Sequence, residues 1–188
     1  VFEAGVENGI EPADCRTYRA KKPCDLITCL YDVIGSFSED SENQKIAENI
    51  KANLASSGHA VISVANSEYA AKRGIRVMDN PTPMELLSAV FDLEPSNAMI
   101  SSGEFFENGG VWDKSRGLFY HKEQFPESSS GLRAEYLVVD RRYTLQEITD
   151  LLDTAGLEII TSRYVRAGFS DECTATTGKE ILLVRVAI

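Results

Sequence analysis

The chain has 188 residues, of which 43% are hydrophobic and 26% are charged, as in a globular domain that buries a sizeable core. Its formal net charge of -10 disfavours nucleic acid and anionic membranes as partners, because an acidic surface repels phosphate. No apolar run approaches the roughly 18 residues of a membrane helix, and no secretory signal is visible. We therefore expect a cytoplasmic protein.

The four cysteines are Cys15, Cys24, Cys29 and Cys173, and no pair has the spacing of a zinc or redox motif. Cys24 and Cys29 are five residues apart, so on a strand their side chains would face opposite sides. We expect these two to be small buried side chains in a reducing cytosol, without a metal or disulfide role.

The first strong signal is an apolar run that begins at Cys24 and predicts a strand buried on both faces. Tyr31 and Asp32 follow where that strand ends, and Gly35 allows the chain to turn. In open α/β sheets, ligands bind at the carboxyl ends of strands, so Tyr31-Asp32 is a candidate floor of a site. The same residues also fit a core strand with an ordinary polar turn.

The next segment predicts a strand–helix–strand unit. Apolar residues recur at helical spacing from Ile46 to Ala55, and Ser57-Gly58 is expected to end this helix. His59 to Ala65 predicts a second buried strand. A unit of this length is typical of a parallel, right-handed crossover.

The middle of the chain predicts a helix and an antiparallel meander. Thr82 is a plausible cap for a helix over Pro83 to Phe91. Short aromatic strands separated by glycine turns follow it, at 104–107, 109–112 and 118–121, with a further strand at 134–139.

The C-terminal part predicts a capped helix between strands. Thr144 and Glu147 have the spacing of a capping box, and Gly156 ends the apolar stripe that follows them. Glu158 to Val165 and Ile181 to Ile188 predict the last two strands.

Two stretches, in this order, resemble the class I S-adenosylmethionine-dependent methyltransferases. The first runs from Ala13-Asp14-Cys15-Arg16 through the strand ending at Tyr31-Asp32 and a helix to the strand over 58–64. The second is Arg141-Arg142-Tyr143-Thr144-Leu145-Gln146-Glu147-Ile148, Leu151-Leu152 and Ala155-Gly156-Leu157. It is similar to the family's R-x-Y-T-x-x-E-I-x-x-L-L-x-x-A-G-F helix, with Leu157 in place of the final Phe.

The resemblance implies an α/β fold: a Rossmann-like, mostly parallel sheet with an antiparallel last strand and a small antiparallel β insertion. It implies one methyltransferase-like domain over residues 1–188, N-terminally incomplete, with residues 97–139 as a β-rich lid. It also implies S-adenosylmethionine as the cofactor and a small molecule as the methyl acceptor.

The resemblance implies roles for residues near the first strand. The Asp14 carboxylate would bind the adenine amino group, Cys15 would offer its backbone N–H, and Arg16 would flank the ring. Leu30 and Tyr31 would line the methionine moiety and the acceptor. Asp32 would orient the acceptor or serve as a base. Asp14 also fits an ordinary turn carboxylate.

On the acceptor side, the candidates are Tyr120, His121, Arg142 and Tyr143. Tyr120 and His121, like Trp112, either line an acceptor pocket or pack the meander against the sheet, because aromatic residues in short strands usually pack. Arg142 and Tyr143 either close the acceptor site or steady the start of a helix.

The family's glycine-rich turn after its first strand is absent from this sequence. In the family the strand order is 3-2-1-4-5-7-6, so without the upstream strands the fourth strand would expose an apolar edge. We expect upstream residues in the native protein; alternatively, another chain covers the edge, for example in a homodimer, or the fragment is rearranged. The functional alternatives are therefore a methyltransferase and a catalytically inactive module that binds a protein partner.

Overall fold

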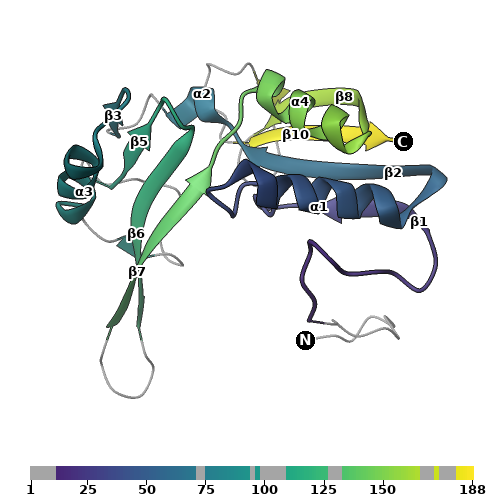
Figure 1. Cartoon of the computed structure of the whole chain (residues 1–188), viewed down its shortest axis with the longest axis horizontal. Coiled ribbons are helices and arrows are strands. Elements are labelled where there is room, and N and C mark those ends of the chain that lie inside the picture. The colour runs from purple at the N-terminus through teal and green to yellow at the C-terminus, as the bar shows by residue number, and fades with distance from the viewer. Residues whose placement is uncertain are drawn as a thin grey trace.

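The computed structural model describes residues 12–70, 75–93, 96–97, 109–126, 133–165, 172–173 and 181–188. Two β-sheets lie side by side in it (Figure 1). The first sheet has the strand order β1-β2-β10-β8-β9. Its strands are β1 (Cys24–Cys29), β2 (Leu54–Ala65), β10 (Ile181–Ala187), β8 (Glu158–Val165) and β9 (Glu172–Cys173).

The strand directions confirm two of the predictions for this sheet. β1 and β2 are parallel neighbours joined by helix α1 (Asp40–Asn53), which is the predicted crossover. β10 is antiparallel to both β2 and β8, so the last strand is antiparallel as expected. The expected mostly parallel pairing is found only in part. β1, β2 and β8 run in one direction, but β10 separates β2 from β8 and makes both of its pairings antiparallel.

The main core lies between this sheet and two helices on one of its faces, α1 and α4 (Leu145–Ala155). The buried residues come from both helices and from the central strands; they include Ile46, Ile50, Ile62, Val64, Ile148, Leu152, Leu182 and Val184. α4 starts with the predicted capping box, in which Thr144 and Glu147 each bind the other's backbone N–H. Gly156 ends the helix with φ 75°. These local predictions are confirmed.

The prediction that Gly58 ends the first helix is wrong, because α1 ends at Asn53 and β2 begins at Leu54. The glycine has another role. A Cβ at Gly58 would lie 2.7 Å from the carbonyl oxygen of Cys24, so the residue allows β1 and β2 to approach closely.

β1 is exposed along much of its length, so the prediction that both of its faces are buried is wrong. Within the described residues its only strand neighbour is β2, which leaves β1 at the edge of the sheet. Leu26, for example, is 61% exposed. Among the described residues, the sheet therefore has an exposed edge with apolar side chains at β1.

The second sheet has the order β3-β5-β6-β4, and β7 also pairs with β6. Its strands are β3 (Arg76–Met78), β5 (Val111–Asp113), β6 (Leu118–Pro126), β4 (Ser96–Asn97) and β7 (Arg133–Arg141). β5, β6 and β7 are antiparallel neighbours, which confirms the predicted meander. The strand predicted at 104–107 lies outside the described residues.

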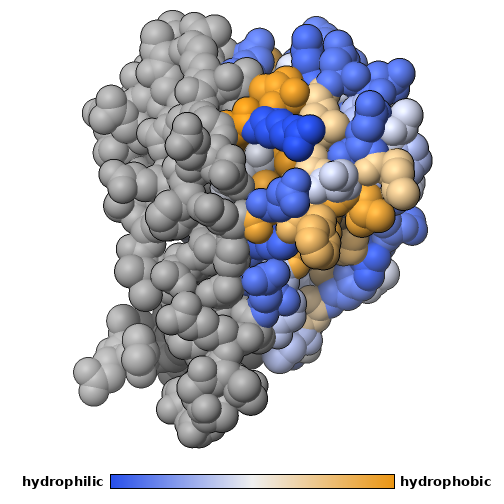
Figure 2. All heavy atoms as spheres, turned by 90° about the vertical axis from the view of Figure 1, so that its left-hand side faces the viewer, coloured by the Kyte–Doolittle hydropathy of each residue, from blue (hydrophilic) through white to orange (hydrophobic). Residues whose placement is uncertain are grey.

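Helix α3 (Pro83–Phe91) packs against this second sheet and is capped by Thr82 as predicted. Ala89 and Val90 form a second core with residues of the sheet. The outer side of α3 carries the exposed side chains of Met84, Leu87 and Phe91. Figure 2 shows apolar side chains gathered on this face of the molecule. A short helix, α2 (Ser67–Ala70), follows β2; none of the described helices is long and apolar enough to cross a membrane.

Candidate functional site

The candidate site starts at the turn after β1. Tyr31 has φ 61° and Asp32 has φ 59°, a left-handed conformation that is uncommon for residues other than glycine. Two such residues in succession cost about 1–2 kcal/mol each, so this conformation persists only where the surroundings fix it. Ser63 on β2 does so from one side, because its Oγ accepts a hydrogen bond from the Tyr31 N–H at 2.8 Å.

The other end of this turn is fixed by α1 and β7. The Gly35 N–H donates to Oδ1 of the buried Asn43 at 2.9 Å. The Gly35 carbonyl oxygen accepts from the Arg141 N–H at 2.8 Å. The turn therefore connects the carboxyl end of β1 to the end of β7 in the second sheet.

Asp32 is partly buried, and its Oδ1 atom has no hydrogen-bond partner among the described residues. Burial raises the pKa of this carboxyl to about 6; the charge of Asp140 adds to the increase, while Arg142 opposes it. A buried acceptor atom without a partner is uncommon in proteins and requires an explanation. The raised pKa is typical of carboxyl groups at functional sites.

β6 and β7 bring His121 next to Asp140. His121 Nε2 lies 3.1 Å from Asp140 Oδ2, and His121 Nδ1 lies 3.7 Å from Glu123 Oε1. The His121 ring stacks on Phe119 with the centroids 5.3 Å apart, and the Arg142 guanidinium lies 3.8 Å from the centroid of the same Phe119 ring. One face of the β6–β7 ladder thus presents a histidine, a carboxylate and an arginine around an aromatic ring.

Tyr120 lies on the opposite face of β6 from His121, because successive side chains of a strand alternate. It is 9% exposed and packs in the second core with Val90 and Leu118. Trp112 is 4% exposed and packs with Phe119. Of the two alternatives left open for these aromatic residues, the structure places Tyr120 and Trp112 in packing positions; Tyr120 faces away from His121, whereas Trp112 packs on the Phe119 ring against which His121 stacks.

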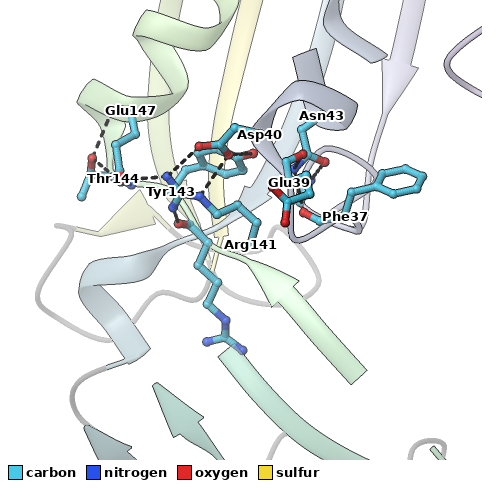
Figure 3. Close-up of polar contacts among 10 residues, drawn as sticks. Phe37, Glu39, Asp40, Asn43, Arg141, Tyr143, Thr144 and Glu147 are labelled. Atoms are coloured by element: carbon cyan, nitrogen blue, oxygen red, sulfur yellow. Dashed lines mark hydrogen bonds and ion pairs between the residues drawn. The ribbon is translucent and has the colours of Figure 1, made fainter. Parts of the chain in front are cut away.

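Tyr143 is also a packing residue. It is 1% exposed in the main core, and its hydroxyl donates to Asp40 Oδ1 at 3.1 Å. Burial raises the pKa of this phenol. The neighbouring side chains point toward one another in Figure 3 and join the start of α1 to the start of α4. Tyr143 therefore steadies the junction between these helices.

The sequence did not indicate the importance of Arg141 in this junction. Its buried guanidinium lies 3.1 Å from Asp40 and 2.9 Å from Glu147, over the ring of Tyr143 (Figure 3). Arg141 opens the second stretch that resembles the family, but that pattern gave it no role. β7 ends at Arg141, and the Arg142 guanidinium lies over the Phe119 ring instead of in this junction. Arg141 stabilises the helices, whereas Arg142 lies on the same face as Asp140.

Asp14 lies on an exposed turn, and residues 12–14 form neither a helix nor a strand. The Asp14 carboxylate accepts four hydrogen bonds from the Arg16 side chain and backbone, at 2.7–3.2 Å, and these lower its pKa to about 2. Arg16 also pairs with Glu42 of α1 at 2.6 Å.

A cavity of about 480 Å³ lies along the exposed edge of β1, between this strand, α1 and the segment before it. Its wall brings together Cys15 and Leu30, which are far apart in the sequence. The lining is largely apolar and includes Tyr18, Leu26, Ile27, Val33, Ile46 and Ile50.

Within the described part of the chain, no group of three His, Cys, Asp or Glu residues could hold a metal ion.

Neither a scan of protein-family models nor a search of curated proteins found a match to the sequence. The structure, in contrast, is similar to many solved structures. One is an S-adenosylmethionine-dependent methyltransferase from Clostridium acetobutylicum ATCC 824, with a TM-score of 0.57 and 13% identity over 94% of this chain and 63% of the other.

Two further structures show the same similarity. The methyltransferase CcbJ from Streptomyces caelestis has a TM-score of 0.57 and 11% identity over 89% of this chain and 62% of its own. The glycopeptide N-methyltransferase MtfA, complexed with S-adenosyl-L-methionine, has a TM-score of 0.52 and 11% identity over 94% of this chain and 58% of its own.

The chain therefore has the fold of the class I S-adenosylmethionine-dependent methyltransferases. It spans about 60% of the length of these solved structures. Its four main strands, β1-β2-β10-β8, have the 4-5-7-6 order expected from the resemblance, with the antiparallel strand in its expected place.

Proposed function

We propose that the protein transfers the methyl group of S-adenosylmethionine to a small-molecule acceptor. The observation that carries this proposal is the Tyr31-Asp32 turn, which follows the first strand of the β1-β2-β10-β8 sheet. In open α/β sheets this is the end of the strand at which ligands bind. Because the chain spans only part of its structural neighbours, the proposal concerns the full-length native protein.

The residues around the β1 edge fit the donor. At the carboxyl end of β1 this cavity is lined by Cys29, Leu30 and Val33, whose apolar side chains suit the uncharged face of a purine. Cys15 and Leu30 both line this cavity, and we propose that they hold the donor with Asp14, Arg16 and Tyr31. When bound, the donor supplies an activated methyl group on a sulfonium sulfur.

The second sheet supplies the acceptor side of the proposed site. We propose that residues 97–139 cover the acceptor within a single domain, with His121 and Arg142 facing it. The Gly35–Arg141 hydrogen bond supports this arrangement, because it fixes the Asp32 turn against the end of β7. Such positioning, with exclusion of water, is the main requirement for an in-line methyl transfer. The cytoplasmic location stays a prediction.

A transfer assay tests the proposed function. The full-length protein is incubated with methyl-labelled S-adenosylmethionine and the small-molecule fraction of a cell extract, with the protein fraction as a parallel acceptor. We expect label in the small-molecule fraction. Label only in the protein fraction would contradict the proposed acceptor class. No label, together with no binding of S-adenosylhomocysteine, would contradict methyl transfer and favour the inactive module.

A further inference from the structure

The environment of Asp32 indicates what kind of group it binds. Its buried Oδ1 atom lacks a hydrogen-bond donor within the described part of the chain, so a ligand that brings an N–H or O–H would remove a buried unsatisfied acceptor. The turn that carries Asp32 is hydrogen-bonded to β7 beside Asp140, because the Gly35 carbonyl oxygen accepts from the Arg141 N–H at 2.8 Å. The electrostatic effects of Arg142 and Asp140 on the Asp32 carboxyl agree with this placement. Asp32 therefore belongs to the same cluster of groups as the His121–Asp140 pair.

The cluster is acidic. The carboxylates of Asp32, Asp140 and Glu123 outnumber the positive charge of Arg142, even when His121 is protonated. The Arg142 guanidinium is placed over the ring of Phe119. A cationic donor group fits this set of charges, whereas a carboxylate or phosphate would meet like charges.

We infer that Asp32, beside the His121–Asp140 pair, binds the protonated amine of the methyl acceptor and takes its proton. This inference rests on the proposed function and specifies its substrate class. In the step, an ammonium N–H bond breaks, the proton passes to the Asp32 carboxylate, and the electron pair stays on nitrogen. The products are a neutral amine, which has the free lone pair that a methyl acceptor needs, and a neutral carboxylic acid.

The pKa values of the two candidate acceptor groups favour an amine over an alcohol as the group that gives its proton to Asp32. An alkylammonium has a pKa near that of lysine, about 10.4, whereas a hydroxyl is close to water at about 15.7. The Asp32 carboxyl, with a pKa of about 6, is therefore much better matched to an amine. His121 acts as a positioning residue in this scheme, because it holds the neighbouring Asp140 carboxylate.

Matched probes test this inference. The full-length protein, saturated with S-adenosylhomocysteine, is titrated at pH 7.5 with benzylamine and with benzyl alcohol, which differ in the charged group. We expect benzylamine to bind at least about tenfold more tightly, as is usual for a hydrogen bond to a charged group. The preference should disappear in Asp32→Asn and weaken in Asp140→Asn. It should also fall in the wild type below about pH 5, as the Asp32 carboxylate is protonated.

The controls separate this inference from the proposed function. Asn adopts the left-handed backbone readily, so Asp32→Asn should keep its fold, which its circular dichroism and thermal unfolding check. Asp153→Asn, an exposed change on α4, should keep the preference for the amine. Equal binding of the two probes, binding of neither, or an unchanged preference in Asp32→Asn would overturn the inference. Failure to bind S-adenosylhomocysteine would instead count against the proposed function.

Discussion

The Arg141 N–H donates a hydrogen bond to the Gly35 carbonyl oxygen across 2.8 Å, and a Cβ at Gly35 would lie 2.5 Å from the Arg141 carbonyl oxygen. The two backbones therefore touch where the turn after β1 meets the end of β7. Gly35 also has φ 121°, which side chains of L residues rarely adopt. This contact places Asp32 beside the second sheet.

Gly35→Ala should destabilise the protein by about 2–4 kcal/mol, because it combines backbone strain with a clash against backbone atoms. Urea unfolding measures this change. Gly156→Ala is a matched control, since its new Cβ would meet the flexible end of Lys51 at 2.2 Å. It should cost only about 1 kcal/mol, near the usual glycine-to-alanine penalty at such a helix end. Equal costs for the two variants would argue against the close contact.

Asp32→Asn should stabilise the protein at pH 7 and have little effect near pH 3. The folded-state pKa of Asp32 is raised from 3.8 to about 6, so the folded protein binds this proton more tightly than the unfolded chain. The wild type therefore loses stability as the pH rises from about 4 to about 6, by an amount of about 1–3 kcal/mol. Asn cannot ionise and should avoid this loss.

The measurement is the free energy of unfolding of wild type and Asp32→Asn between pH 3 and pH 8. The difference between them should grow through the pH window from 4 to 6 and then stay constant. Asp153→Asn should show no such growth, since this carboxylate is exposed. A difference that does not depend on pH would mean that Asp32 is not buried as described.

Arg141→Lys should destabilise the protein by about 1–2 kcal/mol. A lysine cannot contact Asp40 and Glu147 with a planar fork, nor stack on the Tyr143 ring as the guanidinium does. The cost is limited because both carboxylates are partly exposed to solvent. Arg185→Lys, on the exposed side of β10, should change the stability by less than about 0.5 kcal/mol. Thermal unfolding measures the loss of stability in each variant. Equal losses in Arg141→Lys and Arg185→Lys would contradict this account.

Local signals predicted the starts of α3 and α4 well, but not the end of α1. The capping boxes at Thr82 and Thr144 depend on residues three positions apart, and both are present in the structure. The meander followed from glycines between aromatic residues. In contrast, the exposure of β1 depends on which strand lies beside it, and the sequence pattern of an apolar run does not contain that information.

The candidate site was harder to predict because its residues meet only in the folded chain. Asp32 was a candidate from its place after a strand, but its neighbours Asp140 and Arg142 are about a hundred residues away. Tyr120 and His121 are adjacent in sequence, yet β6 places them on opposite faces.

Asp14→Ala should weaken the binding of S-adenosylhomocysteine by about tenfold, because the adenine amino group would lose a hydrogen-bond acceptor. The ion pair with Arg16 keeps the Asp14 carboxylate ionised, with a pKa of about 2, so this effect should not change between pH 5 and pH 8. Calorimetric titration measures it, with Glu39→Ala on the exposed start of α1 as a control. An unchanged affinity in Asp14→Ala would mean that the adenine lies elsewhere.

Calorimetric titration of the full-length wild-type protein with S-adenosylhomocysteine tests the central claim most directly. The account predicts a single site with a Kd on the order of micromolar, about 8 kcal/mol of binding free energy. A properly folded full-length protein that shows no binding of S-adenosylhomocysteine or S-adenosylmethionine would contradict it.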